Sequence, residues 1–438
     1  MKFLYKDSSL VSDSKINTSI DYLSEYIIKL QNVAKDNNFD APESSINLAF
    51  DEVTINKIKE LKNKLVGNNL KYIIDIGIGG SNLGTKAIYD ALYGYFDVLE
   101  PERLPKMFFA DTVDKEYLSK LINFLVKNTK SLDEILICMV SKSGGTAETL
   151  TNFEIIFNKL SEKFEGLEKR VVIISDLNSK LYDAGVKNNM EVLSIPKMVG
   201  GRYSVLSAVG LLPLAALGIN IDKLLEGAKN MRDNCLTNNI FKNYALSSAI
   251  TLFESYKAGF VINDNFIFHE ELESLGKWYR QLMGESIGKE KDINENIVNV
   301  GITPTVSIGS TDLHSVGQLD LGGPKNKLTS FIYINSDESN LVTPEKFVLQ
   351  GLVENIENIP TSKVLDAILE GVKIAYSKHT LPYIEIVLND ISEYSIGEFL
   401  QYKMIEIMYL GKLFNINTFD QPSVESYKIE TKQILSKQ

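Results

Sequence analysis

Residues 135–150 read ILICMVSKSGGTAETL, and this stretch decides the fold. The six apolar residues 135–140 have the pattern of a strand that is buried on both faces of a parallel sheet. Hydroxyl-bearing residues and glycines follow at once, and a helical pattern begins near residue 147. A buried strand that runs into a polar loop and then into a helix is typical of an α/β sheet.

The same unit recurs on both sides of this stretch. Short apolar runs alternate with helical patterns, which predicts a first α/β domain over residues 50–200 with a parallel sheet covered on both faces. Its predicted strands lie at 71–76, 107–110, 135–140, 171–174 and 191–195, and its helices near 82–93, 114–127, 147–164 and 179–188.

The remaining segments complete a two-domain organisation. Residues 1–49 are predicted to form a helical N-terminal segment and residues 201–264 a helical connection. A second doubly wound α/β domain with a mainly parallel sheet is predicted over 265–415, followed by a helical C-terminal tail over 416–438. The second domain's predicted strands are 266–268, 306–308, 328–334 and 383–387, and its helices are about 361–379 and 396–414.

Composition limits the location and the partners. The chain has 438 residues and a formal net charge of −11, which argues against nucleic acid and anionic membranes as partners. Its two cysteines, Cys138 and Cys235, imply no disulfide framework and fit a reducing compartment. The start of the chain lacks a signal-peptide pattern, and no apolar stretch approaches the roughly 20 residues of a membrane helix. We therefore expect a cytoplasmic protein.

Two polar loops follow predicted strands and can hold an anion. One contains Ser141, Ser143 and Thr146, whose hydroxyls are good donors to phosphate oxygens. The other, residues 77–84, is rich in glycine and opens a helix, where free amide groups favour an anion. Composition alone fits ordinary helix capping as well as phosphate binding. A dinucleotide-binding loop is disfavoured, because Asn82 interrupts the G-x-G-x-x-G spacing from Gly77.

Three further segments contain residues that suit acid–base chemistry. Arg202 follows two glycines and keeps its charge at any working pH, so it can stabilise an oxyanion. Gln281 and Glu285 are spaced to share one helix face, and a partly desolvated glutamate suits proton abstraction next to a carbonyl. His314 follows a predicted strand, where an imidazole can shuttle a proton. The three histidines show no metal-ligand spacing, and we expect no metal site.

The chain resembles the phosphoglucose isomerase (glucose-6-phosphate isomerase) family in its shorter bacterial form, from about residue 70 to 430. Six motifs occur in the family's order, which makes coincidence improbable. Gly145 departs from the threonine that is usual in the phosphate loop, and Pro422 replaces a more usual aromatic residue. The resembling segments are 77–81, 141–146, 200–207, 281–286, 310–314 and 417–428.

The resemblance implies a reaction and a set of residue roles. The reaction is reversible isomerisation of glucose 6-phosphate to fructose 6-phosphate through a cis-enediolate, in glycolysis and gluconeogenesis and without a cofactor. It also implies two sugar-isomerase-type domains and a homodimer in which the neighbouring subunit supplies His314. The implied catalytic residues are Glu285, His314, Lys428 and Arg202, and the implied substrate-binding residues are Gly80, Ser81, Ser141, Lys142, Ser143, Thr146, Gln281 and Gln421.

Two alternatives stay open on the sequence. The first is an isomerase that also accepts mannose 6-phosphate, because the two sugars differ only in the placement of one hydroxyl group. The second is a non-catalytic sugar-phosphate sensor with the same fold, which would need the phosphate loops but not Glu285, His314 or Lys428.

Overall fold

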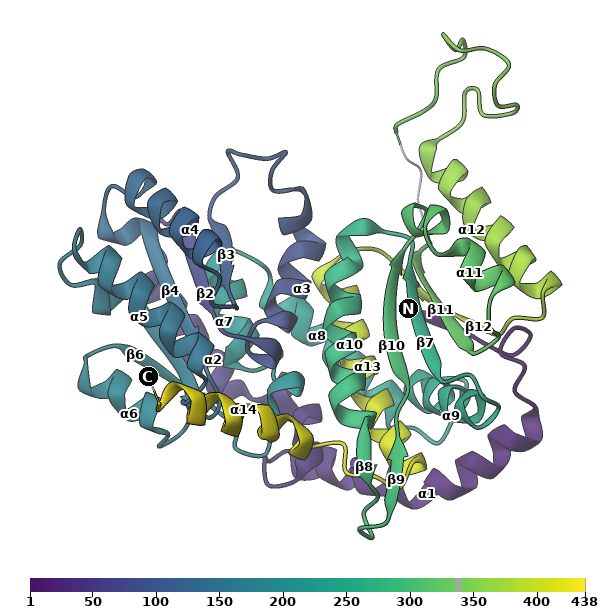
Figure 1. The fold of residues 1–438 in the computed structure, drawn as a ribbon, viewed down its shortest axis with the longest axis horizontal. Coiled ribbons are helices and arrows are strands. Elements are labelled where there is room, and N and C mark those ends of the chain that lie inside the picture. The colour runs from purple at the N-terminus through teal and green to yellow at the C-terminus, as the bar shows by residue number, and fades with distance from the viewer. Residues whose placement is uncertain (336–339, 438) are drawn as a thin grey trace.

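The computed structural model describes residues 1–335 and 340–437, with two five-stranded sheets and helices between and around them (Figure 1). Neighbouring strands of the first sheet are all parallel, in the order β3-β2-β4-β5-β6. All five predicted strands of this sheet are confirmed. They are β2 (Tyr72–Ile76), β3 (Lys106–Ala110), β4 (Ile135–Val140), β5 (Val171–Asp176) and β6 (Glu191–Ile195), with helices α3 (Leu83–Leu92), α4 (Lys115–Asn128), α5 (Ala147–Ser161) and α6 (Lys180–Lys187) between them.

The second sheet has the order β1-β12-β11-β7-β10 and is parallel except at one edge. The four predicted strands form, and the fold class of mainly parallel α/β sheets is confirmed. The edge strand β1 (Lys2–Leu4) is not predicted by the sequence, because three residues are too few for a pattern. The predicted strands are β7 (Ile262–Ile267), β10 (Thr303–Ile308), β11 (Lys327–Ile334) and β12 (Tyr383–Leu388), followed or preceded by α11 (Gly317–Gly322) and α12 (Thr361–Lys378).

The N-terminal segment is therefore not wholly helical as predicted. β1 pairs antiparallel with β12 and places Phe3 in the core, so the first residues belong to the second sheet. After β1 the chain is helical as expected, in α1 (Asp13–Asp36), a 3₁₀ helix (Pro42–Phe50) and α2 (Glu52–Leu65). The domain boundaries 50–200 and 265–415 stay a prediction.

A layer of helices fills the space between the two sheets. α13 (Glu393–Leu413) is almost entirely buried and packs against its neighbours α8, α9 and α10. One apolar cluster contains Ile73 of β2, Ile267 of β7 and Met404 of α13, so the core is shared by both halves. No helix within the described residues is long and apolar enough to cross a membrane. The helices of this layer besides α13 are α7 (Ala208–Leu217), α8 (Ile221–Cys235), α9 (Tyr244–Lys257) and α10 (Glu273–Ile287).

A buried ion pair within α13 accepts a hydrogen bond from α10. Lys403 and Glu406 on α13 are both fully buried, and the lysine Nζ lies 3.0 and 3.1 Å from the two carboxylate oxygens. Tyr279 of α10 donates its hydroxyl hydrogen to Glu406 Oε1 at 2.5 Å. Buried charges are tolerated only when they are paired and hydrogen-bonded, so these contacts fix how α10 lies on α13.

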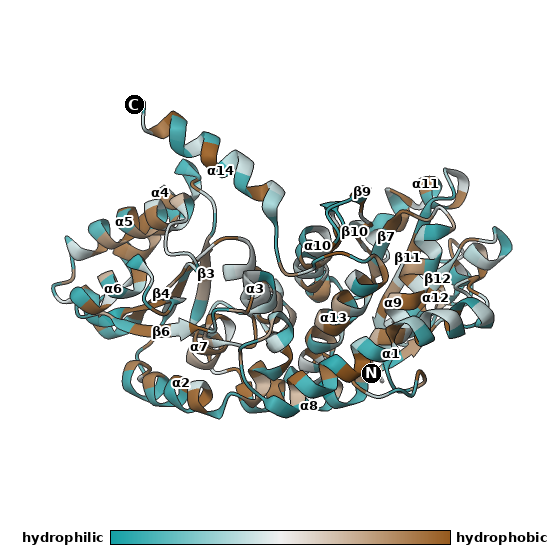
Figure 2. Cartoon of the chain, turned by 90° about the horizontal axis from the view of Figure 1, so that it is seen from below, coloured by the Kyte–Doolittle hydropathy of each residue, from teal (hydrophilic) through white to brown (hydrophobic). Residues whose placement is uncertain are grey.

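Two elements extend from the second half of the chain. The hairpin of β8 (Lys289–Lys291) and β9 (Ile297–Val300) follows α10 directly. The last helix, α14 (Pro422–Leu435), has no buried residue, and Figure 2 shows it extending away from the body. The helical tail that the sequence predicts therefore exists as an exposed helix.

Asp75 of β2 is a buried carboxyl group beneath the first glycine-rich loop. It is fully buried, and neither carboxyl oxygen has a hydrogen-bond partner among the described residues. Burial raises the pKa of Asp75 well above its usual value of 3.8. When the pKa of a carboxyl group is higher in the folded than in the unfolded chain, the free energy of unfolding falls as the pH rises between the two pKa values.

We therefore expect Asp75→Asn to stabilise the protein more at pH 8 than at pH 5. The wild-type chain loses about 1.4 kcal/mol for each pH unit between the unfolded and folded pKa values, and the amide avoids that loss. Thermal unfolding of both proteins at the two pH values measures the difference. An equal effect of the substitution at both pH values would contradict this reading of Asp75.

Candidate active site

The loops after β2 and β4 lie against each other at the carboxyl edge of the first sheet. β2 pairs with β4, and a Cβ atom at Gly77 would lie 3.2 Å from the carbonyl oxygen of Val140. Ser141 is buried, and its Oγ shares a hydrogen bond of 3.0 Å with Thr146 Oγ1. The two loops predicted to hold phosphate are therefore neighbours, as expected for loops that follow adjacent parallel strands.

The other residues of the loop after β4 form hydrogen bonds within the loop and to a neighbouring segment. Ser143 Oγ accepts the Gly145 N–H at 3.4 Å, and Lys142 Nζ donates to the carbonyl oxygen of Lys197 at 2.8 Å. Burial lowers the pKa of Lys142, while the carboxylate of Asp176 raises it. A side chain at position 145 would meet no heavy atom within 4 Å, so lack of space does not explain the glycine there.

Gly80 joins the first loop to the segment that contains Arg202. A Cβ atom at position 80 would lie 2.3 Å from the carbonyl carbon of Gly201 and 2.4 Å from the backbone nitrogen of Arg202. Only glycine allows two backbones to approach so closely. Ser81 follows directly and is partly exposed on the same turn. The glycine-rich loop thus bridges the phosphate loop and the arginine.

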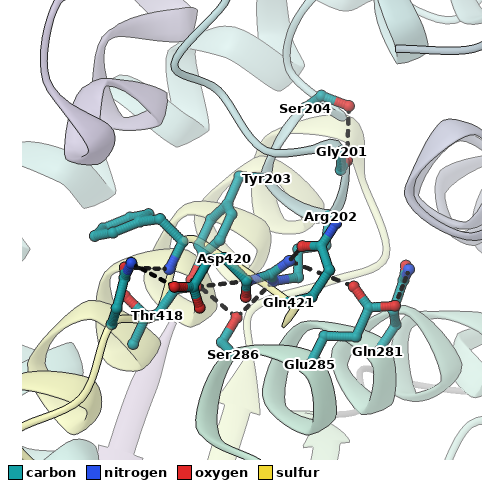
Figure 3. A network of polar contacts seen from close by, with 12 residues as sticks. Gly201, Arg202, Tyr203, Ser204, Gln281, Glu285, Ser286, Thr418, Asp420 and Gln421 are labelled. Atoms are coloured by element: carbon teal, nitrogen blue, oxygen red, sulfur yellow. Dashed lines mark hydrogen bonds and ion pairs between the residues drawn. The ribbon is translucent and has the colours of Figure 1, made fainter. Parts of the chain in front are cut away.

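Arg202 lies at the centre of a polar cluster (Figure 3). Its side chain is buried, with Nε donating to Ser286 Oγ at 2.7 Å and Nη2 to the carbonyl oxygens of Thr418 and Asp420 at 2.6 and 3.0 Å. Nη1 donates to Gln421 Oε1 and lies 3.4 Å from Glu285 Oε2. Every nitrogen of the guanidinium has a partner, which fixes its position rigidly.

Glu285 has a different partner on each side. Gln281, one turn earlier on α10, donates its amide Nε2–H to Glu285 Oε1 at 3.0 Å, while Arg202 lies next to Oε2. The i, i+4 spacing of Gln281 and Glu285 therefore places both side chains on one helix face, as predicted. Within the described residues, Gln281 Oε1 is buried and accepts no hydrogen bond, so it is available to a hydroxyl donor.

His314 and Lys428 lie outside this cluster in the single chain. His314 is exposed on the turn Thr311–His314, which follows β10. Lys428 is partly exposed on α14 and forms an ion pair with Glu425 at 2.8 Å. The chain thus brings Arg202, Gln281, Glu285 and Gln421 together but not the other two predicted catalytic residues. No group of three or more potential metal ligands occurs within residues 1–335 and 340–437.

Several contact residues of the cluster escaped the sequence analysis. Ser286 lies beside Glu285 in the quoted motif, but nothing in the sequence distinguishes its hydroxyl as a partner of Arg202. The carbonyl oxygens of Thr418 and Asp420 leave no signal in a sequence, because every residue has one. Lys289 stands in a charged run, residues 289–292, which has the composition of a solvated surface, yet its side chain is only 5% exposed.

Comparison with known proteins identifies one family. The model of the family described as phosphoglucose isomerase matches residues 54–438. Glucose-6-phosphate isomerase of Methanocaldococcus jannaschii is 34% identical over 361 residues, which are 82% of this chain and 83% of that protein. The protein named glucose-6-phosphate isomerase in Levilactobacillus brevis is 32% identical over 400 residues, covering 89% of this chain and 85% of the relative.

Solved structures share the fold over nearly the whole chain. A hypothetical protein of Thermus thermophilus is similar with a TM-score of 0.83 and 26% identity, covering 97% of this chain and 98% of that one. A glucose-6-phosphate isomerase of Chlamydia trachomatis has a TM-score of 0.77 at 20% identity, with 97% and 86% covered. The arrangement of two sheets around a shared helical core is therefore that of known folds.

Proposed function

The chain belongs to the phosphoglucose isomerase family and interconverts glucose 6-phosphate and fructose 6-phosphate, and from this premise we propose that Glu285 moves the proton. The observation that carries the proposal is the position of its carboxylate between the amide of Gln281 and the guanidinium of Arg202. A base needs a fixed geometry toward the carbon acid, and these two contacts hold both oxygens.

The phosphate group of the substrate binds at the adjacent loops. Ser141, Ser143 and Thr146 donate hydroxyl hydrogens to its oxygens, and Lys142 contributes charge. Ser81 and the backbone at Gly80 complete this end of the site. Support comes from the mutually hydrogen-bonded hydroxyls of Ser141 and Thr146 and from the closeness of the two loops. Binding energy at the phosphate is remote from the reacting carbons and serves to orient them.

Proton transfer then occurs on the open-chain sugar. Glu285 takes the proton from C2 of the aldose, and the electron pair of that bond moves toward the C1 carbonyl oxygen. Arg202 stabilises the negative charge of the resulting enediolate, because it is a fixed cation in a buried place. Glu285 returns the proton to C1 while the hydroxyl proton on O2 passes to O1, which leaves a ketone at C2. Gln281 and Gln421 orient the sugar hydroxyls.

Ring opening precedes this step, and we assign it to His314 and Lys428. Lys428 lies seven residues after Gln421, about 10 Å along the helix axis, so it stands on the helix that begins directly after a residue of the cluster. His314 is exposed in the single chain, which suits a residue that completes the site of a neighbouring subunit.

A homodimer is the assembly that we propose. Residues 340–360, which precede α12, project beyond the body in Figure 1 and expose several apolar side chains, among them Val348 at 99% and Leu352 at 75%. An exposed apolar segment is typical of a surface that contacts another protein chain. We further propose that the enzyme is cytoplasmic.

Mixing two inactive variants should restore activity if His314 acts across the dimer. A dimer of one Glu285→Gln chain and one His314→Ala chain has one site that lacks both residues and one intact site. Statistical exchange of subunits would then give about a quarter of the wild-type specific activity. The measurement is the isomerase rate after the two variants are unfolded together and refolded. Mixed dimers without any recovered activity would place His314 in the site of its own chain.

The substrate range is tested by comparing the rates with two sugar phosphates. Coupled assays with glucose 6-phosphate and with mannose 6-phosphate, each converted to fructose 6-phosphate, would separate a specific from a dual-specificity isomerase. We expect turnover with glucose 6-phosphate. Binding of both sugars without any turnover would instead indicate a sugar-phosphate sensor.

A further inference from the structure

Lys289 is a buried cation directly behind the proposed base. It is the first residue of β8, four positions after Glu285, where the chain leaves α10. Only 5% of its side chain is exposed, although it begins a run of charged residues. A lysine is rarely buried to this degree without a set of specific partners.

The Lys289 ammonium group has two carbonyl acceptors and one carboxylate partner in one small region. Nζ lies 2.6 Å from the carbonyl oxygen of Glu285 and 2.8 Å from the carbonyl oxygen of Asp420. The Asp420 carboxylate forms an ion pair with it at 3.4 Å. The last carbonyl groups of a helix lack partners within the helix, and a cation at this end satisfies one of them.

Lys289 and Arg202 hold the same backbone segment. The carbonyl oxygen of Asp420 accepts from Lys289 Nζ and also from Arg202 Nη2 at 3.0 Å. Gln421, the next residue, is bound to Arg202 through its side chain. The lysine therefore connects the end of the helix that bears Glu285 to the segment that supports Arg202 and Gln421.

The lysine does not face the proposed substrate. It lines a cavity of about 900 Å³ together with Thr418 and Asp420, and neither Glu285 nor Arg202 lines that cavity. Burial and the nearby guanidinium of Arg202 lower the pKa of Lys289, and the Asp420 carboxylate opposes this effect. An ammonium group that contacts two carbonyl oxygens and a carboxylate is held by the protein, which suits a positioning residue and not a group that binds the sugar.

We propose that Lys289 is a positioning residue for the isomerisation, which clamps the carbonyl of Glu285 to Asp420 and so sets the distance between the base and Arg202. This inference rests on the proposed role of Glu285. Because the phosphate is held by the loop after β4, a loosened clamp should slow proton transfer without weakening substrate binding.

The test is Lys289→Met, which keeps the aliphatic chain and removes the charge and the donors. We expect kcat to fall at least tenfold while KM for fructose 6-phosphate changes less than threefold. The matched control is Lys291→Met on the same strand, an exposed lysine paired with Glu295, for which kcat should stay unchanged. Lys289→Arg, which keeps the charge and donors, should recover most of the lost kcat.

Three outcomes separate this inference from the proposed function. If the wild type is active and Glu285→Gln is not, but Lys289→Met keeps wild-type kcat, the positioning role is wrong and the base assignment stands. A tenfold rise in KM at unchanged kcat, in either Lys289 variant, would make the lysine a substrate-binding residue and overturn the proposal. If Lys289→Met does not fold, Lys289→Gln, which keeps an amide donor but not the charge, takes its place, and wild-type kcat in that folded variant would overturn the positioning role.

Discussion

Glu285→Gln is expected to abolish most of the conversion of glucose 6-phosphate to fructose 6-phosphate, with kcat lowered about 10³-fold. The amide cannot accept the C2 proton, yet it has the shape of the carboxylate and can still contact Gln281. Substrate binding should be retained, because the phosphate contacts lie on the loops after β2 and β4. A coupled assay measures the rate, and calorimetric titration with fructose 6-phosphate measures the binding.

A second glutamate on the same helix provides the control for this prediction. Glu273 lies in the first turn of α10 and forms an ion pair with Lys277, away from Arg202. Glu273→Gln should leave kcat within twofold of the wild type. Unchanged turnover in Glu285→Gln would remove Glu285 from the role of base, whereas loss of both turnover and binding would indicate a binding role.

Arg202→Met should lower both activity and stability. The fixed charge next to Glu285 is lost, and the removal of one oxyanion-stabilising group typically lowers kcat about 10²- to 10³-fold. The carbonyl oxygens of Thr418 and Asp420 lose their contacts with the guanidinium. Each buried polar group left without a partner destabilises a protein by about 1–3 kcal/mol. Lys289 still contacts the Asp420 oxygen and the Tyr203 hydroxyl still lies 3.4 Å from the Thr418 oxygen, so we expect a loss at the low end of that range.

Steady-state kinetics and urea unfolding of the variant measure these two effects separately. The matched control is Arg280→Met, an exposed arginine on α10, which should change neither quantity appreciably. Arg202→Lys keeps the charge but not the planar set of donors, so we expect it to recover only part of the activity. A folded Arg202→Met protein with wild-type kcat would contradict a role for this residue in stabilising the enediolate.

Apolar runs were sufficient to predict nine of the ten strands of the two sheets, although β7 and β10 begin at residues 262 and 303, before their predicted starts at 266 and 306. Residues 135–140 are buried on both faces in β4, so every side chain contributes to the pattern. Even the weaker run of β6 was predicted with its observed bounds, Glu191–Ile195. The missed strands were short or exposed. β1 has three residues, and its place beside β12 depends on a contact with a segment more than 380 residues away.

The residue pattern predicted only part of the candidate site. The helical spacing of Gln281 and Glu285 predicted their shared face, and the motif order predicted that Arg202 and Gln421 belong to one site. The roles of these residues remain predictions. The hydrogen bonds that hold these side chains could not be predicted. Several of them end on backbone carbonyl oxygens such as that of Asp420, and every residue type has such an oxygen. A charged run usually lies in solvent, so the sequence does not distinguish Lys289, whose side chain is buried between the end of α10 and Asp420.

Isotope incorporation tests the proton-transfer account most directly. The wild-type enzyme converts unlabelled glucose 6-phosphate in D₂O, and NMR spectroscopy of the product measures deuterium at C1 of fructose 6-phosphate. Proton transfer through Glu285 predicts that solvent deuterium appears at C1, because a carboxylic acid exchanges its proton with water, and that Glu285→Gln incorporates almost none. Full conversion without any deuterium at C1 would indicate a direct hydrogen shift between the carbons and would contradict the account.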